Sequence, residues 1–333
     1  MKTRLEAPPQ APDSGLLRRL LGPFYVTGVF WFRFHRWGVS ILPSWSVGVF
    51  IALFTSFFFV ALRRIRKAIA SNLAAVLGPC GWWRRQGRIY RTLWNFAWCL
   101  SERYERLSTA RRVGAWVEGV EIWEAVQQEP AGFILVTAHI GHWEVGSMFP
   151  DATRRRLHLV REEEMDPRAQ RFVRGLIERA AGTNVTVHFA PAGDPTLGPL
   201  LLNALRRGEV VALQGDRPRT GGGSIEVTLL GRPCELPLGP AALARAAGVD
   251  LLPVYVFREG RHRARVVLRP PLRVAATADR AGDLRRATTA LAEQVEWAIR
   301  LRPFQWFCFR ELWPDGRLRS PEPQKESMTT SGR

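Results

Sequence analysis

Short apolar runs rich in β-branched residues alternate with helical segments in the second half of the chain, and this alternation constrains the fold more than any other feature. The runs lie at residues 132–138, 156–160, 185–189, 210–213, 225–229, 251–257 and 264–268. The helical segments lie at residues 166–181, 194–207, 238–247 and 283–300. Strands that are separated by helices of this length favour a layered α/β fold. We therefore expect a mixed, largely parallel sheet that is flanked by helices.

A long uncharged segment lies upstream of this half. No charged residue occurs between Trp37 and Leu62, although Pro43 would interrupt a helix there. Residues 44–62 would extend about 28 Å as a helix, close to the thickness of the hydrocarbon core of a bilayer. Tryptophans flank this segment on one side and basic residues on the other, as in membrane anchors. We expect residues 22–70 to be a membrane-associated segment with an N-terminal hydrophobic helix that spans the bilayer or lies in its interface. A buried helix of a soluble core is the alternative.

The two ends of the chain differ from its centre in composition. Residues 1–21 have three prolines among the first twelve positions, and we expect a flexible lead there. Residues 316–333 are polar and contain prolines, which predicts a disordered tail. Lysine and arginine number 48 against 30 acidic residues, a net charge of +18 that points to anionic partners such as phosphate, nucleic acid or an acidic membrane face. The four cysteines form no CxxC pair, which indicates reduced thiols in a cytoplasmic setting.

A histidine-rich segment follows the first apolar run directly. In parallel sheets chemistry collects where strands end. His139 and Glu144 would face each other if His139 lies in the turn and Glu144 in the first turn of a helix, with Gly141 letting the chain bend. A carboxylate that is bonded to one imidazole nitrogen fixes the tautomer and makes the other nitrogen a stronger base. Since no serine or cysteine nucleophile lies beside this pair, the substrate would bring its own hydroxyl group. A pair of surface histidines in a loop is the alternative.

The motif HIGHWE at residues 139–144 resembles the histidine–four residues–acid motif of the lysophospholipid acyltransferase superfamily. It is most similar to the bacterial lipid A biosynthesis (lauroyl/myristoyl) acyltransferase branch, whose motif commonly reads HxGNWE, so that His142 stands in place of the usual asparagine. Further stretches agree in order and spacing over residues 30–315. They are Val160-Arg161, Gly215-Asp216-Arg217, Gly231-Arg232-Pro233, Gly239-Pro240-Ala241, Leu252-Pro253-Val254, and Arg302-Pro303 with Gln305-Trp306.

The resemblance implies a glycerolipid acyltransferase-like domain over residues 71–315. It implies that His139 is the general base that removes a proton from an acceptor hydroxyl as the oxygen attacks an acyl thioester, and that Glu144 orients His139.

The resemblance also suggests residues that bind substrate. Arginines are candidates for binding phosphate groups of donor or acceptor, because the planar guanidinium suits bidentate contact. Those in the matching stretches are Arg161, Arg217 and Arg232. We place Asp216 with them, where it orients an arginine or caps a turn.

The resemblance implies acyl-ACP or acyl-CoA as co-substrate, with no resident cofactor and no metal. The acceptor would be a membrane glycolipid such as a lipid A precursor, with a phosphatidylinositol mannoside, a lysophospholipid or an ornithine lipid as alternatives. The expected location is the bacterial inner (cytoplasmic) membrane, with the active site on the cytoplasmic side.

The residues leave two other classes of function open. The positive charge would suit a non-catalytic lipid- or nucleic-acid-binding protein, although the basic residues are dispersed and match no helix-turn-helix, zinc-finger or RRM signature. A lipid hydrolase would use His139 to activate water instead of an acceptor hydroxyl.

Overall fold

The computed structural model describes residues 45–109, 113–143, 155–162, 170–171, 174–175, 185–190, 194–217 and 223–313, with positions 34, 37, 38, 41 and 43. The expected lead over 1–21 and tail over 316–333 lie outside these residues, as does most of the helix expected over 166–181.

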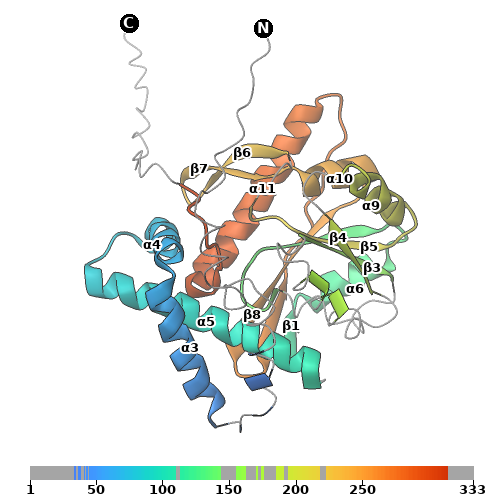
Figure 1. The fold of residues 1–333 in the computed structure, drawn as a ribbon. Helices are drawn as coiled ribbons and strands as arrows, with labels where there is room; N and C mark the ends of the chain where they lie inside the picture. Colours follow the sequence, from blue (N-terminus) through green and yellow to red (C-terminus); the bar gives the residue numbers. More distant parts are fainter. Residues whose placement is uncertain are drawn as a thin grey trace, which may run out of the picture.

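Seven of the described strands form the central sheet, in the order β1-β9-β8-β2-β5-β3-β4 (Figure 1). They are β1 (Gly114–Glu118), β2 (Phe133–Thr137), β3 (Leu157–Glu162), β4 (Val185–Ala190), β5 (Val210–Gln214), β8 (Leu251–Gly260) and β9 (Arg263–Leu268). The five strands from β8 to β4 run parallel to one another, whereas β9 is antiparallel to β8 and β1 is parallel to β9. The largely parallel sheet predicted from the sequence is confirmed, and β1 is an additional strand that the sequence analysis did not identify.

Helices cover both faces of this sheet, which is why β2 is apolar along its whole length. Successive residues of a strand face opposite sides. Ile134 and Val136 face the larger core cluster, to which α9 (Leu197–Arg206), α10 (Gly239–Ala247) and α11 (Arg280–Leu301) contribute. Phe133 and Leu135 face a smaller cluster on the other side, against α6 (Val120–Gln128). The chain thus forms three layers, with β2 in the middle of the sheet.

A separate antiparallel hairpin, β6 (Ser224–Leu229) and β7 (Arg232–Pro237), packs on α11. Its turn consists of Leu230 and Gly231, both with positive φ, and Glu296 of α11 accepts a hydrogen bond from the Leu230 N–H (2.6 Å). The matched stretch Gly231-Arg232-Pro233 therefore runs from the turn into β7, which begins at Arg232.

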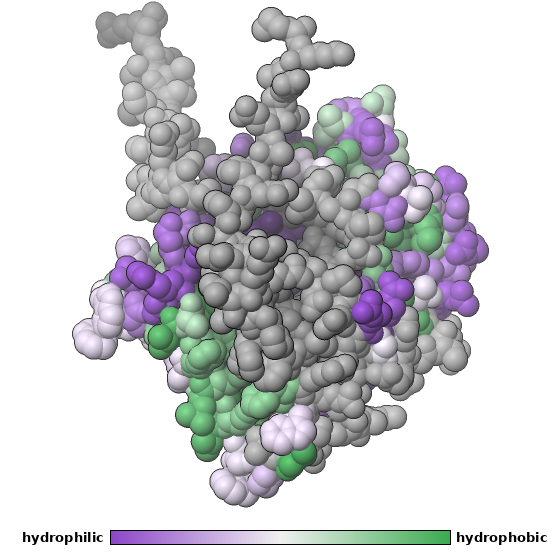
Figure 2. Space-filling view, viewed as in Figure 1, coloured by the Kyte–Doolittle hydropathy of each residue, from purple (hydrophilic) through white to green (hydrophobic). Residues whose placement is uncertain are grey.

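Ahead of the sheet lie the helices α3 (Val47–Ala61), α4 (Arg63–Leu77) and α5 (Trp82–Thr109). Among the described residues no single helix combines the length and apolar character needed to cross a membrane; α3 and α4 meet both conditions only as a pair, and they are bent by 93° where they meet at Leu62. The outer face of α3 is strongly apolar (Figure 2). Val60 in this helix is 72% exposed, and Trp45, just before it, is 80% exposed. Ile89 and Leu93 of α5 are buried, so this helix packs an apolar face into a core.

The segment after α11 returns beneath the end of β2. A short 3₁₀ helix, η3 (Pro303–Gln305), lets the Gln305 carbonyl accept a hydrogen bond from the Gly141 N–H (2.9 Å). The Phe307 N–H donates to the His139 carbonyl (2.8 Å). The Gln305 amide side chain in turn bonds both the N–H and the C=O of Arg258 in β8. Residues 303–307 therefore fix the loop that carries His139.

Gly141 is required at its position for two reasons. Its φ of +56° disfavours residues with a Cβ, and a Cβ there would collide with the carbonyl oxygen of Val256. Gly231 has a similar φ of +72°, but a Cβ there would meet open space. A substitution at Gly231 therefore introduces backbone strain alone, whereas one at Gly141 introduces strain and steric collision together.

We predict that Gly231→Ala lowers the free energy of unfolding by about 1–2 kcal/mol, the cost of a left-handed backbone, and that Gly141→Ala lowers it by clearly more. Chemical denaturation followed by tryptophan fluorescence measures both. Equal losses in the two variants would contradict the packing described for the loop after β2.

Candidate active site

The pairing of β2 with β5 brings two polar residues together at the carboxyl edge of the sheet. Thr137 and Gln214, the last residues of the two strands, are in register, and the Gly215 N–H donates to the Thr137 carbonyl (2.8 Å). His139 lies two residues beyond Thr137, and Asp216 lies two residues beyond Gln214. The active sites of parallel sheets form at this edge.

Asp216 holds His139 through both of its carboxylate oxygens. Oδ1 is 2.7 Å from Nδ1 of the imidazole, and Oδ2 accepts a hydrogen bond from the His139 backbone N–H (3.2 Å). Asp216 has no exposed surface. Burial alone raises the pKa of Asp216, but the facing His139 and Arg217 outweigh burial and lower that pKa to about 2. The carboxylate is therefore ionised at neutral pH and can only accept hydrogen bonds.

Arg217 contacts the other imidazole nitrogen. Its Nη2 lies 2.6 Å from Nε2 of His139. Since a guanidinium has donors and no acceptor, Nε2 must present its lone pair to Arg217, just as the Asp216 carboxylate requires the proton to lie on Nδ1. The two contacts assign a neutral imidazole with the proton on Nδ1. This is the tautomer in which Nε2 serves as a base.

Aromatic rings pack beside this imidazole. The Trp143 ring centroid is 5.5 Å from that of His139, and Phe307 lies 5.6 Å from Trp143. Phe96 of α5 contacts Phe307 in an edge-to-face arrangement. These rings provide an apolar wall on one side of the base, and the sequence analysis did not identify them. Trp143 lies inside the HIGHWE motif and Phe307 directly follows Gln305-Trp306, whereas Phe96 lies beside no matched stretch.

The structure brings two of the predicted substrate-binding residues, Asp216 and Arg217, onto His139. Arg161 lies near the carboxyl end of β3, the strand beside β5, and is half-buried. Arg232 begins β7, and its guanidinium carbon lies 5.6 Å from the ring centroid of Trp313. Glu144, the predicted partner of His139, lies outside the described residues.

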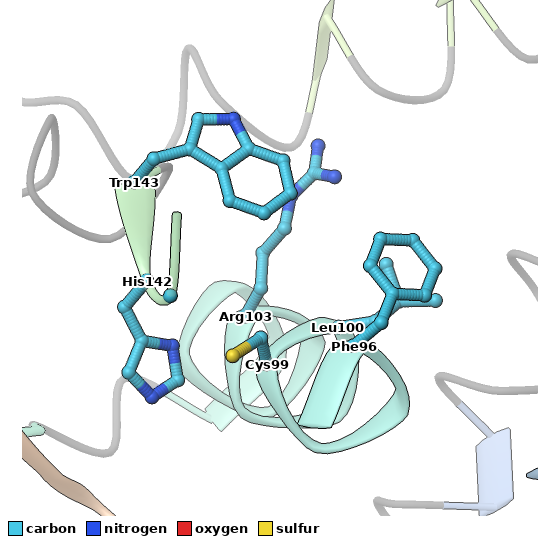
Figure 3. A pocket seen from close by; sticks show the side chains of 7 residues that line it. Phe96, Cys99, Leu100, Arg103, His142 and Trp143 are labelled. Carbon is cyan, nitrogen blue, oxygen red and sulfur yellow. The ribbon is translucent and has the colours of Figure 1, made fainter. Parts of the chain in front are cut away.

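His142 points away from His139 into a buried ionic cluster. Its Nε2 is 2.6 Å from Oε2 of Glu102 in α5, and Glu102 also contacts the Arg258 guanidinium (3.2 Å). Only 2% of His142 and 1% of Glu102 are exposed. Figure 3 shows the His142 ring beside Cys99 of α5 at a cavity of about 10 Å³. Burial opposes protonation, but Cys99 and Glu102 raise the pKa of His142 to about 9. His142 therefore ties the loop after β2 to α5.

A second histidine cluster was missed entirely. His158 and His188, on the paired strands β3 and β4, are joined by a 2.8 Å contact between Nδ1 and Nε2. His158 Nε2 is also 2.7 Å from Glu209, just before β5. Burial and the neighbouring His158 lower the pKa of His188. The cluster lies toward the amino end of β5, so it is separate from the site at the carboxyl edge.

Known proteins resemble this chain over most of its length. A sequence profile of the family described as bacterial lipid A biosynthesis acyltransferase matches residues 18–314. The phosphatidylinositol mannoside acyltransferase of Mycobacterium tuberculosis (strain CDC 1551 / Oshkosh) is 26% identical over 317 residues, covering 92% of each chain. That of Mycolicibacterium smegmatis (strain ATCC 700084 / mc(2)155) is 24% identical over 205 residues, covering 61% of this chain and 64% of the relative. The matched residues include the whole candidate site.

The His142–Glu102 pair predicts how stability changes with pH. The pKa of His142 is raised to about 9 from 6.5, so the pair stabilises the fold fully below pH 6.5 and loses this contribution as pH rises through about 9. In denaturant titrations from pH 6 to 10, we expect the free energy of unfolding to fall more steeply with pH in the wild type than in His142→Asn. The same pH slope in both proteins would contradict a protonated His142.

Proposed function

The chain belongs to the bacterial lipid A biosynthesis acyltransferase family and is an acyltransferase, and we propose that it transfers a fatty acyl chain from acyl-ACP or acyl-CoA to a hydroxyl group of a membrane glycolipid. The observation that carries the proposal is the assigned tautomer of His139, with Nδ1–H on Asp216 and the lone pair on Nε2.

In the proposed reaction Nε2 of His139 removes the proton of the acceptor hydroxyl as its oxygen attacks the thioester carbonyl. The Asp216 carboxylate, 2.7 Å from Nδ1, stabilises the imidazolium that forms. The imidazolium then gives its proton to the departing thiolate, so the base is restored. General base catalysis of this kind contributes roughly 10²- to 10⁴-fold to rate.

The family resemblance assigns the orientation of His139 to Glu144, whereas the carboxylate on Nδ1 in the structure is Asp216. We keep both acids in the proposal with different tasks. Asp216 holds the ring and balances its charge, and Glu144 remains a predicted member of the machinery. Arg161 and Arg232 remain predicted ligands of phosphate groups, and the position of Arg161 near the carboxyl edge supports that task.

A glycolipid acceptor agrees with the names of both kinds of relative, since lipid A and phosphatidylinositol mannosides are sugar-bearing lipids that carry phosphate. We propose a sugar hydroxyl as the acceptor group, with a lipid A precursor as the first candidate and a phosphatidylinositol mannoside as the second.

We also propose that the enzyme works at the inner membrane with its site on the cytoplasmic side. The exposed apolar face of α3 supports this, because large exposed apolar patches are characteristic of membrane or partner surfaces. The basic start of α4 lies directly beyond the bend, where Arg63, Arg64 and Lys67 are exposed. Cations next to an apolar face suit an interface of anionic lipids.

The test is acyl transfer by the purified protein in mixed micelles. The donors are palmitoyl-ACP and palmitoyl-CoA, and the acceptors are a lipid A precursor, a phosphatidylinositol mannoside and a lysophospholipid without sugar, supplied separately. We expect mass spectrometry to detect one added acyl ester on a glycolipid. Free fatty acid as the sole product would indicate hydrolysis, and transfer confined to lipids without sugar would refute the acceptor class.

We predict that Asp216→Asn lowers kcat by on the order of 10²- to 10³-fold. An asparagine has one acceptor oxygen, whereas His139 presents two N–H donors to this side chain. His139→Ala should lower kcat at least as far. Arg300→Gln on the exposed face of α11 is the matched control and should retain full activity. Full activity of Asp216→Asn would remove Asp216 from the proposed mechanism.

A further inference from the structure

We propose that Arg217 is a latch on the base: in the free enzyme its guanidinium occupies the lone pair of His139, and an anionic group of the bound substrate draws it away before His139 accepts a proton. The proposal rests on the proposed function, because it concerns the regulation of the same site.

The geometry leaves the base with no free position. Nδ1 of His139 carries a proton that Asp216 accepts, and Nε2 is occupied by Arg217 at 2.6 Å. An imidazole nitrogen has one lone pair in the ring plane, so a substrate hydroxyl cannot bond to Nε2 while Arg217 donates to it. Proton transfer from the acceptor therefore requires Arg217 to leave.

The two groups that hold His139 differ in how firmly they are fixed. Asp216 is fully buried and bonds both the ring and the backbone of His139. Arg217 is half-buried and reaches Nε2 through a long side chain. Loss of Asp216 from its place would leave a buried charge unpaired, whereas Arg217 can turn toward solvent or ligand at small cost. Asp216, which is fixed, sets the tautomer of His139, and Arg217, which can move, blocks Nε2.

An anion is the chemistry that releases this contact. A neutral imidazole offers a guanidinium one acceptor, whereas a phosphate offers two charged oxygens in a geometry that matches the guanidinium fork. The phosphate has two possible sources, the thioester donor or the glycolipid acceptor. In either case the same movement that binds the anion exposes Nε2, so substrate binding and activation of the base become one event.

The consequence is protection of the thioester. An exposed Nε2 would also activate water, whose oxygen would attack the thioester carbonyl, release the thiol and yield a free fatty acid. The water proton would pass through His139 to the departing thiolate. While Arg217 occupies Nε2 this reaction is suppressed, and a releasing phosphate on the acceptor would keep the thioester protected until the acceptor is in place.

The first test measures the reactivity of Nε2 without any acyl transfer, so it does not depend on the proposed function. Diethyl pyrocarbonate modifies unprotonated imidazole nitrogens, and peptide mass spectrometry resolves His139 from His262, which serves as the internal reference. We expect at least a tenfold faster modification of His139 in Arg217→Met, which keeps an unbranched stem and removes the donors. Arg217→Lys, which keeps a donor, should stay near the wild-type rate, as should the control Arg300→Gln. Equal rates in Arg217→Met and wild type would overturn the latch.

The source of the anion is identified in the same assay. Free coenzyme A and a phosphorylated glycolipid are added separately to the wild type, and we expect one of them to accelerate modification of His139. The compound that does so contains the releasing phosphate. The latch fails if neither accelerates modification in the wild type.

The second test measures coupling. The readout is hydrolysis of acyl-CoA without acceptor. If the acceptor carries the releasing phosphate, Arg217→Met should hydrolyse acyl-CoA at least tenfold faster than the wild type, whose base stays blocked. If coenzyme A carries it, acyl-CoA releases Arg217 in the wild type too, and Arg217→Met should instead show a raised KM for acyl-CoA. A merely structural role would reduce hydrolysis and transfer together and leave KM unchanged. A folded Arg217→Met that shows neither change would overturn the proposal, even if acyl transfer itself is confirmed.

Discussion

The contact between His139 and Asp216 is the constraint on which the rest of the site depends. The two residues are far apart in the chain, and they meet because β2 and β5 are neighbours that end in register. The apolar residues of these strands bury both faces of the sheet and therefore set that register. A slip of one residue would turn the side chains of β5 to the opposite face and separate the imidazole from its carboxylate. The strand register that stabilises the core therefore also places the imidazole and the carboxylate together at the edge of the sheet.

Three further elements hold the loop after β2, and each does so by a different kind of contact. The segment after α11 bonds its backbone, β8 accepts the His142 N–H through the Val256 carbonyl, and α5 binds the His142 side chain through Glu102. Burying that ion pair has a desolvation cost, which the 2.6 Å approach of the two groups and the additional contact of Arg258 offset. The result is a base whose backbone is fixed from several directions. Arg217, by contrast, reaches the ring of His139 through a long, half-buried side chain.

Much of this arrangement could be predicted from the sequence. The alternation of apolar runs with helical segments predicted the largely parallel sheet, and the position of His139 directly after a strand predicted an active-site base. The partner on Nδ1 could not be read from spacing, because local sequence suggests Glu144 while strand pairing brings in Asp216. The useful signal was that His139 and Asp216 each stand two residues beyond the end of a strand. The bend at Leu62 and the short β1 carry no periodic pattern, so they emerge only when tertiary packing is known.

The segment after α11, which holds the loop after β2, is synthesised late, and this affects when the site can form. A nascent chain that has left the ribosome only as far as β9 already contains the base and its carboxylate, together with most of the sheet. It still lacks Gln305 and Phe307, whose backbone bonds seat Gly141 and His139. The enzyme therefore becomes active late in translation, after α11 has packed and the segment that follows it has bonded to the loop after β2. Until that moment the growing polypeptide contains the base but lacks the contacts that hold its loop in place.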